Sequence, residues 1–174
     1  MAKARSKQAD ADAAEAMDIG LSIDKRSQSA KALNETLDGT YSLMVLTHVY
    51  HWNVRGPLFG QLHKLLQEQY EALFASVDEI AERIRQLGFD APVNPGKFPS
   101  GIQMPGSLPD EFGMVADLKR RNEAAIRTLR KASSDADEAK DYVTQDLCNK
   151  CLAHHEKAAW MLRASLDSEQ RDGQ

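Results

Sequence analysis

Between Leu58 and Leu87, apolar side chains recur at the spacing of one helix face, and this regularity limits what the chain can fold into. The residues that share this three-, four- and seven-residue spacing are Leu62, Leu66, Leu73, Val77, Ile80, Ile84 and Leu87. Such a stripe is typical of the buried face of a long amphipathic helix. The opposite face carries Glu79 and Arg83, one turn apart, which we expect to lie in water and to pair with each other.

A third stripe of the same helix carries potential metal ligands. His63 and Gln67 are one turn apart, and so are Asp78 and Glu82. The two pairs are separated by roughly 22 Å along a straight helix, so one ion cannot contact both. If they form one site, an antiparallel helix from a second subunit must supply the acids, and two-fold symmetry then makes two such sites. The alternative is that Asp78 and Glu82 are ordinary solvated acids.

Three further helices are expected around this one. The first runs from near Asp24 to Val54, with Ser22 as a plausible N-cap. The third begins at Pro109, which suits a first-turn position. The fourth is expected from about 135 to 167, after a turn around Ser133 and Ser134, because acidic residues favour the N-terminal end of a helix.

The connections between these helices indicate the topology. Gly56 and Pro57 end the first helix and turn the chain back, which brings His51 towards His63. Residues 89–109 hold five of the six prolines, and a long irregular connection of this kind predicts the crossover of a ferritin-like four-helix bundle. We therefore expect an all-α domain over residues 23–168, with a mobile tail at 1–22 and a short tail at 169–174.

Charge and composition restrict the partners and the compartment. The net charge is −4, so the folded body should repel nucleic acid, and any DNA contact should come from the basic tip of the tail, Lys3, Arg5 and Lys7. A plain leader without DNA affinity is the alternative. No stretch has the length of a transmembrane helix or the apolar region of a signal peptide, and two cysteines make no disulfide framework. These features favour a cytoplasmic protein.

Two motifs carry a resemblance to a known family. The first is H-W-N-x-x-G-P-x-F-x-x-x-H, from His51 to His63, and the second is D-x-x-A-E-R, from Asp78 to Arg83. Together they resemble the Dps family, the ferritin-like DNA-protection proteins of starved bacterial cells. The resemblance implies a hollow dodecameric shell. It also implies a ferroxidase centre in which His51 and His63 of one subunit and Asp78 and Glu82 of its two-fold mate bind non-haem iron.

The activity implied by this resemblance is oxidation of Fe(II), preferably by hydrogen peroxide, with ferric mineral stored in the shell and DNA protected from oxidative damage. Histidine with carboxylates suits Fe(II), and the chain has no Glu-x-x-His motif for an intrachain di-iron site. Two alternatives are a DNA-compacting protein with an impaired ferroxidase centre and a purely structural helical oligomer.

One position departs from the family pattern. The acid expected one turn after the second histidine is replaced by Gln67, an amide that offers a carbonyl oxygen but no charge. Relatives carry H-E-K and a tryptophan near the C-terminal end, matched here by His155, Glu156, Lys157 and Trp160. His155 is therefore the candidate for an additional metal ligand that compensates for Gln67.

Overall fold

The computed structural model of the protein describes residues 16–92 and 105–166, and the regular elements in these ranges are all α-helices. They are α2 (Ile23–Asn53), α3 (Phe59–Gln86), α4 (Glu111–Ala139) and α5 (Tyr142–Leu166). The all-α prediction is confirmed. None of these helices is both long and apolar enough to cross a lipid bilayer.

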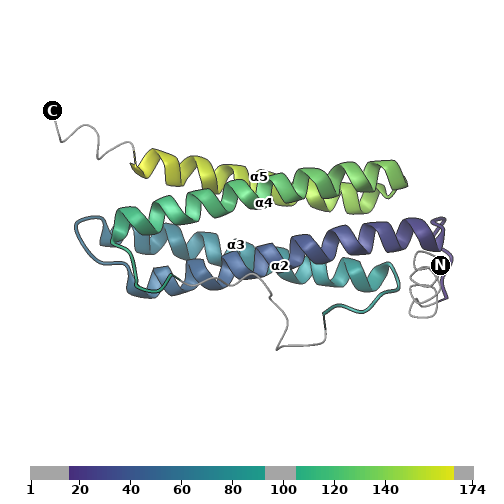
Figure 1. Ribbon diagram of the computed structural model, residues 1–174, viewed down its shortest axis with the longest axis horizontal. Coiled ribbons are helices and arrows are strands. Elements are labelled where there is room, and N and C mark those ends of the chain that lie inside the picture. Colours follow the sequence, from purple (N-terminus) through teal and green to yellow (C-terminus); the bar gives the residue numbers. More distant parts are fainter. Residues whose placement is uncertain (1–15, 93–104, 167–174) are drawn as a thin grey trace.

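The four helices form a bundle of two antiparallel pairs, α2 with α3 and α4 with α5 (Figure 1). The pairs join mainly through α2 and α4. Helix α3 ends at one end of the bundle and α4 begins at the opposite end, so the two helices run in the same direction (Figure 1). The chain between them must therefore connect opposite ends of the bundle, which confirms the predicted crossover topology.

The apolar stripe of α3 is buried in the bundle as expected. Ile80 and Ile84 pack with Leu33, Leu37 and other residues in one half of the core. The other half is built around Leu43, Leu46, Leu62, Leu66, Leu118 and Leu162. Each such side chain stabilises the fold by about 1.5–3 kcal/mol when it leaves water, so the two clusters hold all four helices together.

A tight turn between α2 and α3 fixes the relation of these two helices. Val54 ends α2 in an extended conformation, and Gly56 has a φ of 110°, which favours glycine. A Cβ on Gly56 would also collide with the Glu111 carboxylate at the start of α4. The positive φ is the main reason that the turn favours glycine, since the Glu111 side chain is flexible and can move. The turn sets the last turn of α2 against the first turns of α3.

The predicted boundary between the third and fourth helices is wrong. Helix α4 continues through Ser133 and Ser134 to Ala139, and the break falls at Lys140, which has a left-handed conformation with φ of 62°. The carboxylate of Asp141 accepts a hydrogen bond from the backbone N–H of Thr144 at 3.1 Å and so caps α5. The acids from Asp135 to Glu138 consequently lie in the last turn of α4, not at the start of α5.

Arg83 also departs from its predicted place in water. Its side chain is 10% exposed, and Nη2 forms an ion pair with Asp141 Oδ1 at 2.7 Å. Its Nε donates to Thr144 Oγ1 at 2.9 Å. Glu79 pairs instead with Lys150 of α5 at 2.6 Å. Arg83 therefore fastens α3 to the start of α5 from inside the bundle.

Candidate metal centre

His51 and His63 lie face to face across the turn between α2 and α3. His51 is in the last turn of α2 and is buried, whereas His63 is in the second turn of α3 and is half-buried. Their rings stack with centroids 3.8 Å apart and planes 20° apart. The structure thus brings the two predicted histidine ligands together within one chain.

Reciprocal hydrogen bonds hold this pair. The Nδ1 of His51 lies 2.8 Å from the backbone carbonyl of His63, and the Nδ1 of His63 lies 3.0 Å from the carbonyl of His51. Because a carbonyl oxygen only accepts hydrogen bonds, each Nδ1 must carry the proton. In the neutral rings, the lone pair therefore resides on Nε2, which is the usual arrangement of a metal-binding histidine.

Aromatic side chains surround the pair. Tyr70 lies edge-on to His51 with centroids 5.2 Å apart and stacks on His48 at 4.0 Å. Phe59 stacks on His63 at 5.1 Å. Trp52, which the motif places beside the site, packs against His48 and is 63% exposed. The sequence interpretation did not select Tyr70, although it follows His63 by seven residues on the same helix.

Gln67 is exposed one turn after His63 and is held by a neighbour. Its Nε2 donates to Glu71 Oε1 at 2.8 Å. This bond leaves the amide oxygen of Gln67 as its available metal-binding group. Glu71 lies on the same stripe of potential ligands as His63 and Gln67, at the i,i+4 spacing that also relates Gln67 to His63, but the sequence pattern did not single it out as a ligand.

Asp78 and Glu82 are exposed near the other end of α3, and the structure does not bring them to the histidines of the same chain. Across residues 16–92 and 105–166, no three histidine, cysteine, aspartate or glutamate side chains come together as a metal-binding group. A single chain therefore places two candidate imidazole ligands at one end of α3 and two candidate carboxylate ligands about four turns further along.

His155 is not positioned to assist Gln67. Its side chain is 2% exposed and lies between helices, with Nδ1 bonded to Asn122 Oδ1 of α4 at 2.9 Å. It faces Gln69, which points almost opposite to Gln67 on α3 because two residues turn a helix by about 200°. The expected compensating role of His155 is therefore wrong within one chain.

The two cysteines are buried in the core next to α3. Burial raises the pKa of Cys148 to about 12 and that of Cys151 to about 11. Both thiols therefore stay protonated at neutral pH, which does not favour metal binding or redox exchange.

The basic side chains of α4 are largely paired with acids. Arg120 and Arg121 both contact Asp117, and the other pairs are Lys119 with Glu123, Arg130 with Glu156 and Lys131 with Asp135. This pairing reduces the positive electrostatic potential that α4 would offer to a polyanion such as DNA. Lys3, Arg5 and Lys7, the predicted DNA contacts, lie outside the described residues.

Comparison with known proteins places this architecture in a family. The ferritin-like domain family matches residues 30–171. DNA protection during starvation protein 1 of Deinococcus radiodurans is 36% identical over 147 residues, which cover 82% of this chain and 70% of that protein. DpsC from Streptomyces coelicolor has a TM-score of 0.83 at 28% identity, over 88% of this chain and 91% of that one.

The structure of a Dps protein from Vibrio cholerae O1 is similarly close, with a TM-score of 0.81 and 28% identity over 88% of this chain and 98% of that one. That protein is described as a member of a broad superfamily of ferritin-like diiron-carboxylate proteins. The family match and the relatives cover most of this sequence. The chain therefore belongs to the Dps family of ferritin-like proteins.

Proposed function

We propose that this protein oxidises Fe(II) at sites shared between two copies of the chain and stores the ferric product inside a closed, dodecameric shell. In this scheme, the Nε2 atoms of His51 and His63 bind the substrate iron. Asp78 and Glu82 of a second copy complete the site. The oxidant is hydrogen peroxide, and its removal together with Fe(II) protects DNA.

The observation that carries this proposal is the incomplete site of the single chain. The reciprocal bonds leave an Nε2 lone pair on each of the two stacked rings, yet no carboxylate of the same chain joins these rings in the described ranges. Imidazole with carboxylate oxygen is a suitable ligand set for Fe(II) with open positions. We therefore assign the missing carboxylates to Asp78 and Glu82 of another copy of the chain.

The surface of α3 supports a second copy as their source. When two copies of α3 pack antiparallel, residues face each other if their numbers add up to the same value. A dimer with Asp78 opposite His63 therefore also has Glu82 opposite Phe59 and Phe74 opposite Gln67. Phe59 is 48% exposed and Phe74 is 67% exposed. Large exposed apolar side chains often mark a protein interface, and this dimer would cover both.

The redox step balances with hydrogen peroxide as the electron acceptor. Two Fe(II) ions each lose one electron, the O–O bond of one peroxide breaks, and two protons complete two water molecules. No free hydroxyl radical is released when both electrons arrive at the same site. A second iron near the first is thus needed, and Gln67 with Glu71 is the group on this chain that would hold it.

Protection of DNA by direct binding is the second candidate function. A relative is named for DNA protection during starvation, and the basic tip of the chain carries Lys3, Arg5 and Lys7. The paired charges of α4 and the net charge of −4 oppose binding by the body. We therefore assign any DNA affinity to the tail, where many weak contacts would add up in an oligomer.

Kinetics of Fe(II) oxidation test the proposal. Purified protein should oxidise Fe(II) with hydrogen peroxide far faster than buffer does. His63→Ala and Glu82→Ala should each slow the reaction at least about a hundredfold, since even outer contacts of metal ligands contribute 10–100-fold. Lys64→Ala, at an exposed position next to His63, is the control and should keep the full rate. Oxidation no faster than in buffer would refute the proposal.

A further inference from the structure

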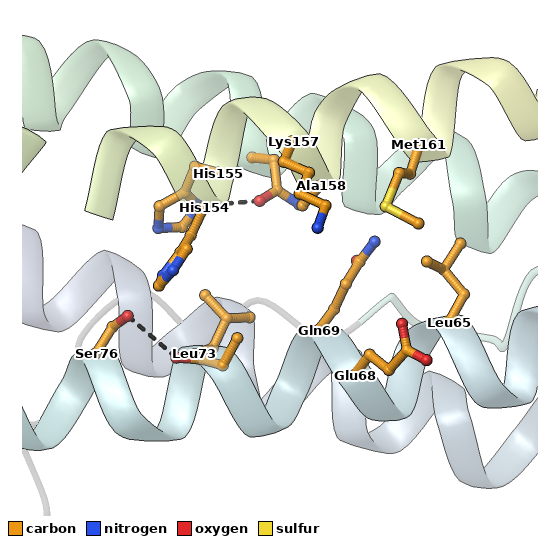
Figure 2. A pocket seen from close by; sticks show the side chains of 12 residues that line it. Leu65, Glu68, Gln69, Leu73, Ser76, His154, His155, Lys157, Ala158 and Met161 are labelled. Carbon is orange, nitrogen blue, oxygen red and sulfur yellow. Dashed lines mark hydrogen bonds between the residues drawn. The ribbon is translucent and has the colours of Figure 1, made fainter. Parts of the chain in front are cut away.

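A pocket of about 250 Å³ lies between α3 and α5, and the proposed iron chemistry does not use it. Its apolar wall consists of Leu65, Ala72, Leu73, Ala158 and Met161. Glu68 and Lys157, which are exposed, carry opposite charges at its edge. Figure 2 shows Gln69 reaching from α3 towards α5, with Met161 on one side and His155 on the other.

Two buried polar atoms in this pocket have no hydrogen-bond partner in the protein. They are Nε2 of His155 and Nε2 of Gln69, and these residues are 2% and 8% exposed. Buried polar groups in folded proteins nearly always have a partner. Two unpartnered groups lining one pocket are therefore positions at which a bound molecule would make hydrogen bonds.

The protonation state of His155 defines what that molecule must offer. The amide nitrogen of Asn122 donates to the Leu118 carbonyl at 2.9 Å, so its Oδ1 faces His155 Nδ1 and accepts from it. The lone pair of the neutral ring then lies on Nε2. Burial lowers the pKa of His155 to about 4, with a further contribution from His154, so the ring stays neutral at pH 7. His155 requires a donor, whereas the Gln69 amide group offers one.

Other kinds of ligand fit this pocket less well. An anion would meet the lone pair of His155 and receive no compensating cation in the interior. A metal ion would find the imidazoles of His154 and His155 among the lining residues, but no group of three histidine, cysteine or acidic side chains able to hold a metal occurs in the part of the chain that the structure describes. The apolar wall favours a ligand whose surface is mostly apolar.

We infer that this pocket binds a small neutral molecule with a hydroxyl group on an apolar ring or chain. The hydroxyl proton is donated to His155 Nε2, and the hydroxyl oxygen accepts from Gln69 Nε2. The apolar part lies against Leu65, Leu73 and Met161. His51 and His63 do not line the pocket, so this site is independent of iron oxidation.

Calorimetric titration of the full-length protein with phenol tests the inference. Toluene has the same ring without a hydroxyl group, and anisole has an oxygen that accepts but cannot donate. Phenol should bind at least about tenfold more tightly than either control, since each lacks a hydrogen bond to a buried group. Failure of phenol to bind, or equal affinity for the three compounds, would overturn the inference.

Substitutions locate the binding. Ala158→Phe should abolish it because the larger side chain fills the pocket, and Gln69→Leu should weaken it about tenfold by removing one bond. Gln61→Leu, on an exposed part of α3 outside this pocket, is the matched control and should bind normally. If Ala158→Phe does not fold, Gln69→Leu decides the question. Phenol affinity unchanged by Gln69→Leu, or lowered equally by Gln61→Leu, would place the binding elsewhere.

Discussion

His51 and His63 each donate a hydrogen bond from Nδ1 to the backbone carbonyl of the other, at 2.8 and 3.0 Å. These two bonds fix the tautomers and the positions of both rings before any metal binds. A preorganised pair of this kind loses less freedom when it binds an ion. Because each acceptor is a backbone carbonyl, replacing one ring by alanine removes the stacking contact but leaves the hydrogen bond of the other ring in place.

Gln67 should make the second metal position weaker than the first. We expect Gln67→Asp to tighten the second Fe(II) by roughly tenfold and to speed oxidation by peroxide, since a charged oxygen binds a cation more strongly than an amide dipole. Anaerobic titration with Fe(II) measures both positions. His155→Ala is the control and should change neither, because His155 lies in a different part of the bundle. Two equally tight ions in the unaltered protein would contradict this view of Gln67.

Removal of Arg83 should destabilise the bundle strongly. Arg83→Met leaves Asp141 buried without its ion partner, and breaking a buried pair in this way costs about 3 kcal/mol or more. Lys150→Met, which breaks the exposed pair with Glu79, is the comparison and should have little effect. Chemical denaturation at equal protein concentration measures both. If the two variants lose the same free energy of unfolding, burial is not what makes the Arg83–Asp141 pair stabilising.

The same ion pair predicts a dependence of stability on pH. Burial raises the pKa of Asp141, but hydrogen bonds from Thr144 and the Arg83 charge outweigh it, so the pKa lies below its usual value of 3.8. The stabilisation is therefore fully present above about pH 4 and is lost as the pH falls through the lower pKa of the folded state. The stability difference between the unaltered protein and Asp141→Asn should shrink over that acidic range. A difference that grows on acidification would contradict the assigned direction.

Local patterns predicted the elements of the fold better than the junction between α4 and α5. The apolar stripe of α3 and the Gly56 turn depend on neighbouring residues, and both are found as expected. The junction depends on Asp141, whose ion partner Arg83 is 58 residues away. Acids before α5 looked like a helix start because they favour that end of a helix, and only the burial of Asp141 identifies which acid is the cap.

The candidate site was likewise predicted only where it depends on residues close in the sequence. Spacing on α3 and the turn predicted that His51 and His63 meet. The resemblance to relatives named His155 as a candidate ligand, but it could not show which side chains surround this residue. The contacts of His155 with Asn122 and of Gln67 with Glu71 depend on helix packing and rotamers, which sequence spacing does not determine.

DNA binding should depend on the first residues of the chain. Deletion of residues 1–8 removes Lys3, Arg5 and Lys7, and it should abolish a gel shift at low salt while leaving Fe(II) oxidation unchanged. Substitution of the three basic residues by glutamine, at full chain length, separates charge from length. Because binding through phosphates weakens as salt rises, any remaining shift should be measured over a salt series. A shift that survives both changes would indicate the basic side chains of α4.

Oligomers mixed from two inactive variants test whether the iron site is shared between two chains. His51→Ala/His63→Ala chains and Asp78→Ala/Glu82→Ala chains should each be inactive alone. When the two are coexpressed in equal amounts, random pairing should rebuild about one quarter of the sites, because the histidines must come from one kind of chain and the acids from the other. We expect recovery of about a quarter of the original Fe(II) oxidation rate, whereas no recovery above the two separate variants would show that the site is not shared.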